Sequence, residues 1–179
     1  MRIAFTGAHG TGKSTLVEPI ARALELPELG TPGRWLKSHG IQVNKDAGVD
    51  TQAIGWFVQY RYEHEHESWI SSRSMLDVLA YAAVPATERT LGEYERHLLE
   101  QMTLATRDHL LSGCYDLLIY TPPRIPLVAD EVRIADQQFQ TATDAFIAAR
   151  LEEWSVPHHA IDVTDAGIAD RIVELARAS

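Results

Sequence analysis

A glycine-rich turn near the start of the chain limits the possible folds more than any other feature of the sequence. Residues 7–14, GAHGTGKS, fit the pattern G-x-x-x-x-G-K-[ST] at every defined position. The apolar residues Ile3, Ala4 and Phe5 before the turn predict a short buried strand, and a helix is predicted over residues 13–24. Strand, glycine-rich loop and helix in this order are typical of a loop that binds phosphate groups.

The expected nucleotide-binding residues form one continuous segment, called the phosphate loop below. It consists of Gly7, Ala8, His9, Gly10, Thr11, Gly12, Lys13, Ser14 and Thr15. The glycines let backbone amides surround the phosphates, and the helix that follows adds the positive end of its dipole. We expect Lys13 to bridge the β- and γ-phosphates, Ser14 to bind Mg²⁺ and Thr15 to reach the α-phosphate. ATP and Mg²⁺ are therefore the predicted cofactors.

The composition favours one folded domain rather than a disordered or membrane-embedded chain. The chain has 179 residues, of which 45% are hydrophobic and 23% are charged, and single cores usually span about 100 to 200 residues. Its formal charge of −9 opposes non-specific binding to nucleic acid. Cys114 is the single cysteine, so no disulfide can form within the chain, and we expect a cytoplasmic protein without a membrane segment.

Alternating strand and helix patterns predict a parallel sheet covered on both faces. Strands are expected at residues 1–6, 24–29, 69–71, 116–120 and 159–163. Helices are expected at residues 13–24, 34–38, 51–67, 75–84, 91–111, about 139–154, and 168–178. The predicted fold is thus a three-layer α/β sandwich with about five parallel strands, in a single domain covering residues 1–179.

Ligands of an open parallel sheet bind beyond the carboxyl ends of its strands, which selects a second group of candidates. These are Arg34, Ser72, Arg73, Arg124, Asp130 and Arg133. Phosphoryl transfer concentrates negative charge, and the forked donors of arginine are suited to phosphate oxygens. We expect Arg34 and Arg73 to hold the acceptor, and Arg124 and Arg133 to shield the transferring group. An exposed salt bridge is the structural alternative for each arginine.

A proline-stiffened segment at about residues 121–135 is predicted to act as a lid. It begins TPPRIPLVADEVR and carries two of the candidate arginines, Arg124 and Arg133. A lid that closes over ATP would exclude water, which would otherwise compete with the acceptor.

With these segments in place, the chain resembles the small AAA-type P-loop kinases related to nicotinamide riboside kinase. It is also similar to phage deoxynucleoside monophosphate kinases and, more distantly, to thymidylate kinases. WISSRSMLDVLAYA (residues 69–82) resembles the family's strand, its Asp-Arg-Ser segment and its D-x-x-A-Y helix; IPLVADEVRIADQQF (residues 125–139) resembles its lid. Arg34 in GRWLKSHGI takes the place of a family arginine near the acceptor. The resemblance implies the P-loop NTPase fold in its nucleoside monophosphate kinase-like form.

One departure from the family bears on the acceptor. Ser72 stands where the family commonly has an aspartate. A hydroxyl acceptor needs a carboxylate to take its proton, whereas a phosphate acceptor is already an oxyanion. The serine therefore favours a nucleoside monophosphate, although Asp77 or a glutamate such as Glu28 could supply the missing carboxylate.

Three hypotheses follow from the sequence. The leading one is an ATP- and Mg²⁺-dependent kinase that converts a (deoxy)nucleoside monophosphate to the diphosphate. The second is a nucleoside-type kinase that phosphorylates a hydroxyl of nicotinamide riboside, of a nucleoside or of a modified base in DNA, with Asp77 as a catalytic residue. The third is a nucleotide-dependent switch or assembly ATPase. A small-molecule acceptor is the expected partner, and homodimer formation stays open.

Overall fold

Four parallel strands form the centre of the protein. The computed structural model describes residues 1–41, 47–125 and 136–178. The strands are β1 (Arg2–Thr6), β2 (Trp69–Ser71), β3 (Leu117–Tyr120) and β4 (His159–Ala160), in the spatial order β2-β1-β3-β4. All three strand pairs are parallel, with Ala4 opposite Ser71, Thr6 opposite Tyr120, and Tyr120 opposite Ala160. The carboxyl ends of the strands therefore share one edge of the sheet.

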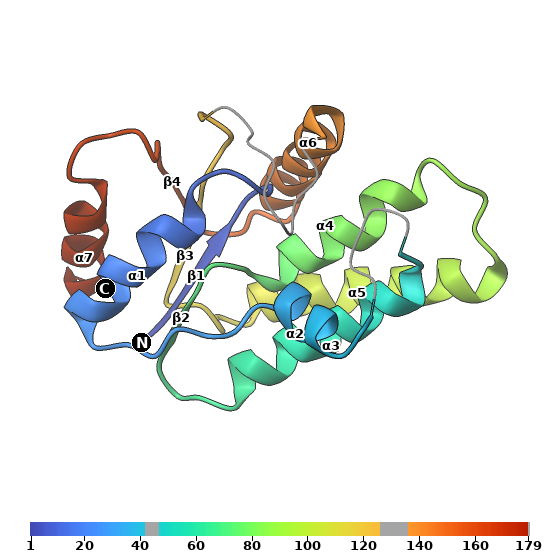
Figure 1. Ribbon diagram of the computed structural model, residues 1–179, viewed down its shortest axis with the longest axis horizontal. Helices are drawn as coiled ribbons and strands as arrows, with labels where there is room; N and C mark the ends of the chain where they lie inside the picture. The colour runs from blue at the N-terminus through green and yellow to red at the C-terminus, as the bar shows by residue number, and fades with distance from the viewer. Residues whose placement is uncertain (42–46, 126–135, 179) are drawn as a thin grey trace.

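Helices cover both faces of this sheet (Figure 1). α1 (Lys13–Leu24) and α7 (Ile168–Ala178) lie on one side, and α3 (Val49–His64), α4 (Met75–Ala86), α5 (Glu93–Leu111) and α6 (Gln137–Glu153) lie on the other. The short α2 (Pro32–Ser38) packs on α3. This arrangement confirms the predicted α/β fold with a parallel sheet between two helical layers.

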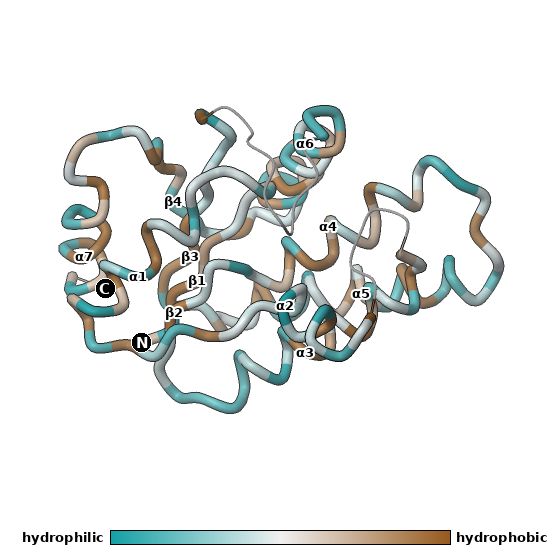
Figure 2. The backbone as a smooth tube through the Cα atoms, in the orientation of Figure 1, coloured by the Kyte–Doolittle hydropathy of each residue, from teal (hydrophilic) through white to brown (hydrophobic). Residues whose placement is uncertain are grey.

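Side chains that alternate along the strands build two separate cores, as expected for a sheet buried on both faces. Ile3 and Phe5 of β1 pack toward α1 and α7, whereas Ala4 between them belongs to the core under α3, α4, α5 and α6. Figure 2 shows the apolar colour concentrated along the strands, while the segment between α3 and β2 is hydrophilic.

The sheet has fewer strands than the sequence predicts, because residues 24–29 do not form one. α1 extends to Leu24, and Glu28 forms a single parallel bridge with Ile70. Two backbone hydrogen bonds hold this bridge, from the amide of Leu29 to Ile70 and from the amide of Ile70 to Pro27. Pro27 has no amide hydrogen to donate, so the ladder does not extend.

The predicted helices are confirmed, with small shifts at their ends. The helix predicted over residues 75–84 continues through Pro85 to Ala86, and the strand predicted over residues 159–163 ends at Ala160. The single domain over residues 1–179 stays a prediction. The lid also stays a prediction, because residues 126–135 lie outside the described part of the chain. Among the described helices, none is both long and apolar enough to span a membrane.

A pair of leucine substitutions tests this assignment of the core. Leu79 of α4 is fully buried, whereas Leu104 of α5 is 48% exposed. We expect Leu79→Ala to lower the free energy of unfolding by about 2 to 5 kcal/mol, because it leaves a cavity in the core. Leu104→Ala is the matched control, with an expected change within about 0.5 kcal/mol. Urea unfolding measures both, and equal losses would contradict the predicted burial.

Candidate active site

The phosphate loop connects the carboxyl end of β1 to the first turn of α1, at the centre of the sheet. Lys13 is the first residue of α1 and is 5% exposed. Its ammonium group donates hydrogen bonds to the carbonyl oxygens of Gly7 (2.5 Å) and Ala8 (2.6 Å), and to the hydroxyl of Thr11 (3.2 Å). The side chains of Ser14 and Thr15 are exposed on the first turn of the helix. The loop is therefore wrapped around a buried cation, with two hydroxyl groups on the accessible side.

Gly7 and Gly12 have backbone conformations that other residues rarely adopt, with φ angles of +143° and +85°. Gly7 is also confined in space. A Cβ atom at this position would lie 2.5 Å from the carbonyl oxygen of Thr121, which directly follows β3. The close approach of these two backbone segments requires glycine at position 7.

Two residues that are distant in the sequence, Thr121 and Gln140, form hydrogen bonds that hold the phosphate loop in place. The Thr121 hydroxyl lies 2.9 Å from that of Thr11 and donates to the carbonyl of Thr6 (3.2 Å). The amide group of Gln140 on α6 donates to the carbonyl of His9 (2.7 Å). The loop is thus fixed by the strand on one side of it and by a helix of the opposite layer.

Asp77 joins the phosphate loop to the end of β2. Its carboxylate is fully buried and accepts hydrogen bonds from the Gly7 amide (3.3 Å), the Ser74 amide (3.1 Å), the Ser74 hydroxyl (2.8 Å) and Arg73 (3.2 Å). The ammonium group of Lys13 lies 3.8 Å away. One carboxylate therefore bonds to both Arg73 and the loop, and also caps α4.

Arg73 follows β2, as the sequence predicts, and its side chain is 21% exposed. Its guanidinium group lies 5.3 Å from the centre of the Tyr81 ring, in a cation–π arrangement. Burial opposes the positive charge, but Tyr81 and Asp77 outweigh it and raise the pKa of Arg73. Ser72, next to it, is buried, at 2% exposed.

The two other predicted arginines that the structure describes, Arg34 and Arg124, are more exposed than Arg73. Arg34 is exposed on α2. Arg124 is 59% exposed and forms a 3.7 Å ion pair with Asp162, which follows β4. Asp130 and Arg133 lie outside the described residues, so their expected roles stay predictions.

Four residues of this region were not among the predicted site residues: Ser74, Thr121, Gln140 and Asp144. Ser74 could have been found, because its spacing to Asp77 is that of a capping box at the start of a helix. No local pattern indicates Gln140, whose contact with His9 spans 131 residues. Asp144 on α6 is half-buried and accepts a hydrogen bond from the Tyr120 hydroxyl (3.0 Å). Burial raises the pKa of Asp144, although Tyr120, Lys13 and Arg124 partly offset this effect.

Comparison with known proteins places this chain in a family. The model of the AAA domain family matches residues 2–171. The chain belongs to this family. The predicted resemblance to AAA-type P-loop proteins is therefore confirmed. No curated protein matches the chain by sequence.

Several solved structures share the fold of this AAA domain. Deoxyadenosine kinase from M. mycoides with bound dCTP has a TM-score of 0.71 at 15% identity, and the match covers 100% of both chains. The NadR protein in complex with NAD and AMP-PNP has a TM-score of 0.69 at 16% identity; the match covers 99% of this chain but 48% of NadR, so this chain spans about half of that protein. Shikimate kinase from Acinetobacter baumannii has a TM-score of 0.57 at 13% identity, covering 99% of this chain and 93% of the kinase.

Two glycine substitutions test the close contact behind the phosphate loop. In Gly7→Ala the new methyl group meets the backbone of Thr121, and alanine rarely adopts this φ angle. We expect the free energy of unfolding to fall by about 2 to 6 kcal/mol and ATP binding to be lost. Gly33→Ala is the matched control, because no atom lies within 4 Å and the residue is inside α2. It should be neutral or stabilising by up to about 1 kcal/mol. Urea unfolding and ATP titration measure both, and normal ATP binding by Gly7→Ala would contradict the predicted clash.

Proposed function

We propose that this AAA domain is an ATP- and Mg²⁺-dependent kinase that transfers a phosphoryl group to a (deoxy)nucleoside monophosphate. One observation carries the proposal: Lys13 of the phosphate loop and Arg73 at the end of β2 both lie within 4 Å of the same buried carboxylate, Asp77. A cation suited to the donor phosphates and a cation suited to an acceptor phosphate are therefore held side by side. This arrangement is compatible with in-line transfer between two phosphates, because such transfer depends on positioning the phosphates and offsetting their charge.

The residues of the phosphate loop fit ATP. The space beside Gly7 is too narrow for a side chain, and its conformation lets the loop amides face a phosphate chain. Lys13 would hold the β- and γ-phosphates, and the exposed hydroxyl groups of Ser14 and Thr15 would reach the metal ion and the α-phosphate. Bound Mg²⁺ would offset negative charge on the phosphates.

The acceptor side would be formed by the residues that follow β2. Arg73 would hold the acceptor phosphate, since Asp77 and Tyr81 fix its guanidinium group while part of it stays exposed. Arg34 would extend this surface from α2, and Arg124 would shield the transferring group from the far side of the loop. Ser72, Asp130 and Arg133 complete the proposed set as predicted from the sequence.

The contacts of Asp77 support a phosphate acceptor over a hydroxyl acceptor. One carboxylate oxygen accepts from the Gly7 amide and Arg73, and the other accepts from the Ser74 amide and hydroxyl. A carboxylate surrounded by donors in this way is suited to holding cations in place. It is poorly suited to taking a proton from an alcohol. A nucleoside monophosphate needs no such base.

A second candidate function is phosphorylation of a nucleoside hydroxyl. The observation that favours it is the half-buried carboxylate of Asp144 near the phosphate loop. Its raised pKa suits a general base, and it lies close enough to Lys13 and Arg124 for their charges to act on it. Glu28 is the other candidate base, since it is exposed beside β2.

The comparisons support phosphoryl transfer as a class. The similar structures include two proteins named as kinases and NadR bound to AMP-PNP, an ATP analogue. The deoxyadenosine kinase was also solved with dCMP and dCDP described as products. Each of these activities belongs to its own protein, and the acceptor of this chain is part of our proposal.

A coupled assay of ADP release over a panel of monophosphates and nucleosides tests the proposed reaction. We expect at least one (deoxy)nucleoside monophosphate to raise ADP release about tenfold or more above the water background. Lys13→Ala should lose this activity and ATP binding, because the phosphate loop loses its cation.

Each other outcome of the panel has a defined meaning. Turnover of nucleosides alone, abolished in Asp144→Asn, would replace our proposal with the second candidate. Slow ATP hydrolysis that no acceptor increases would contradict both kinase functions and favour the switch or assembly ATPase.

The assigned role of Arg73 is tested by its replacement with lysine. Arg73→Lys keeps the charge but loses the forked donors, so we expect the acceptor KM to rise about tenfold or more while the ATP KM changes less than about twofold. Arg61→Lys is the matched control, because Arg61 near the end of α3 is 56% exposed and, among the described residues, contacts only its neighbours: it forms an ion pair with Glu65 just after the helix and lies over the Tyr62 ring. Steady-state kinetics measure both, and equal effects would remove Arg73 from the acceptor site.

A further inference from the structure

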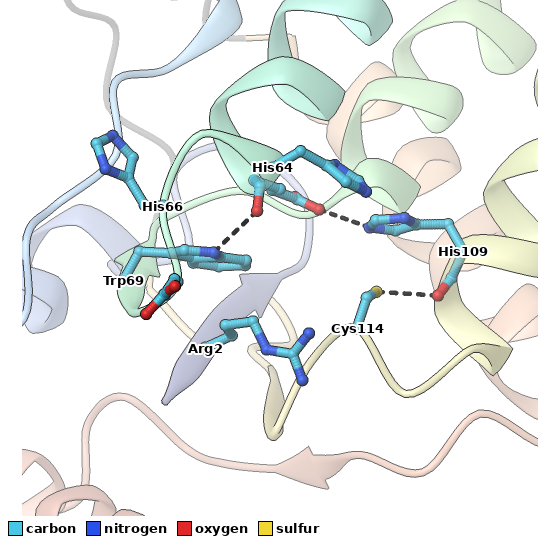
Figure 3. A pocket seen from close by; sticks show the side chains of 8 residues that line it. Arg2, His64, His66, Trp69, His109 and Cys114 are labelled. Atoms are coloured by element: carbon cyan, nitrogen blue, oxygen red, sulfur yellow. Dashed lines mark hydrogen bonds and ion pairs between the residues drawn. The ribbon is translucent and has the colours of Figure 1, made fainter.

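A second buried carboxylate belongs to Glu63 on α3 and faces α5, at the end of the sheet opposite the phosphate loop. Its side chain is 1% exposed. It accepts hydrogen bonds from Gln59 (2.7 Å), from His109 (2.6 Å) and from the Tyr115 hydroxyl, which lies 3.0 Å from each of its oxygens. We call these four residues the Glu63 network. Figure 3 shows His109 and Trp69 at the wall of a cavity of about 330 Å³, together with Arg2, His64 and Cys114.

In the Glu63 network, three donor side chains face one acceptor, the carboxylate of Glu63. Burial and the nearby charge of Glu63 raise the pKa of Tyr115 well above its usual value, so its hydroxyl remains a donor. The same two causes raise the pKa of Cys114 to about 12, and its thiol donates to the carbonyl of His109. Because an apolar cluster of similar volume often stabilises a protein as well or better, stability alone does not explain a buried charge here.

The network ends on the backbone that directly follows the Arg73 side chain, at the Arg73 carbonyl and the Met75 amide. The amide group of Gln59 donates to the carbonyl of Arg73 (3.2 Å) and bonds Glu63 at the same time. The Tyr115 hydroxyl accepts a hydrogen bond from the amide of Met75 (3.0 Å), the first residue of α4. That amide has no partner within its own helix, so Tyr115 satisfies it. Residues 73–75, which include the end of the connection from β2 and the first residue of α4, are therefore held at two points by the Glu63 network.

Another polar contact between the same two helices shows what is special about this network. Trp56 on α3 donates a hydrogen bond to the hydroxyl of Thr106 on α5 (2.8 Å), and Thr106 is fully buried. This bond also joins α3 to α5, but it does not involve the segment between β2 and α4. It provides a matched comparison for a purely structural hydrogen bond.

We propose that Glu63 is a positioning residue that, through Gln59 and Tyr115, fixes residues 73–75 so that Arg73 is aimed at the acceptor site. The proposal rests on the acceptor role of Arg73 given above. Asp77 and Tyr81 hold the guanidinium group from the active-site end, and the Glu63 network holds the backbone from the opposite end. Changes among buried residues at the amino end of the sheet would then alter acceptor binding.

Tyr115→Phe, Glu63→Gln and Thr106→Val test this proposal with two readouts. Losing one hydrogen bond in the network corresponds to about 1 to 2 kcal/mol, or a change of about 5- to 30-fold. We expect Tyr115→Phe and Glu63→Gln to raise the acceptor KM by this factor and to leave the ATP KM within about twofold. Amide hydrogen exchange at Met75, followed by NMR, should become faster by a similar factor. Thr106→Val should lower the melting temperature without moving either readout.

The two readouts separate the possible failures. If Tyr115→Phe and Glu63→Gln lose stability but leave the acceptor KM and the exchange at Met75 unchanged, as in Thr106→Val, the network is structural and the proposal is wrong. If Glu63→Gln does not fold, Tyr115→Phe decides by itself, since it removes one hydroxyl. If the parent protein shows no acceptor-dependent turnover, the proposed function fails, while the exchange at Met75 still decides whether the network fixes this segment.

Discussion

The bonding of Asp77 is the interaction on which the rest of the active site depends. A buried carboxylate is costly unless donors surround it, and here the donors come from two parts of the chain that are about 70 residues apart. They are the Gly7 amide of the phosphate loop, the Ser74 cap of α4 and the guanidinium group of Arg73. Because these donors converge on one carboxylate, Asp77 connects the phosphate loop, the start of α4 and the side chain of Arg73.

Groups from both sides of the phosphate loop hold it in place. Thr121 approaches Gly7 from β3, and Gln140 reaches the carbonyl of His9 from α6. Backbone atoms that face inward must find partners, and these two side chains provide some of them. The donors suited to phosphate can therefore be pre-organised, which is how a protein stabilises charge that develops during a reaction.

The chain combines an acidic composition with local positive charge at the carboxyl edge of the sheet. Its net charge is −9, yet Lys13, Arg73 and Arg124 all lie at this edge, and each has an acidic neighbour. Paired in this way, the cations are held in defined places instead of repelling one another. The Glu63 network applies the same principle at the other end of the sheet, where a buried anion orders the backbone below Arg73.

The phosphate loop, the alternation of strands and helices, and the position of Arg73 after a strand could all be predicted from the sequence. These features depend on local rules: glycine at strained φ angles, the period of apolar residues and the parallel direction of the strands. Residues 24–29 show the limit of such rules, since the apolar pattern suited a strand but Pro27 and the extension of α1 left a single bridge. Tertiary packing brings together groups that are far apart in the sequence: the backbone of Thr121 and Gly7, Gln140 and the carbonyl of His9, and Tyr115 and the amide of Met75. Their contacts span many residues of chain, so their partners are set by how the layers pack and leave no periodic trace in the sequence.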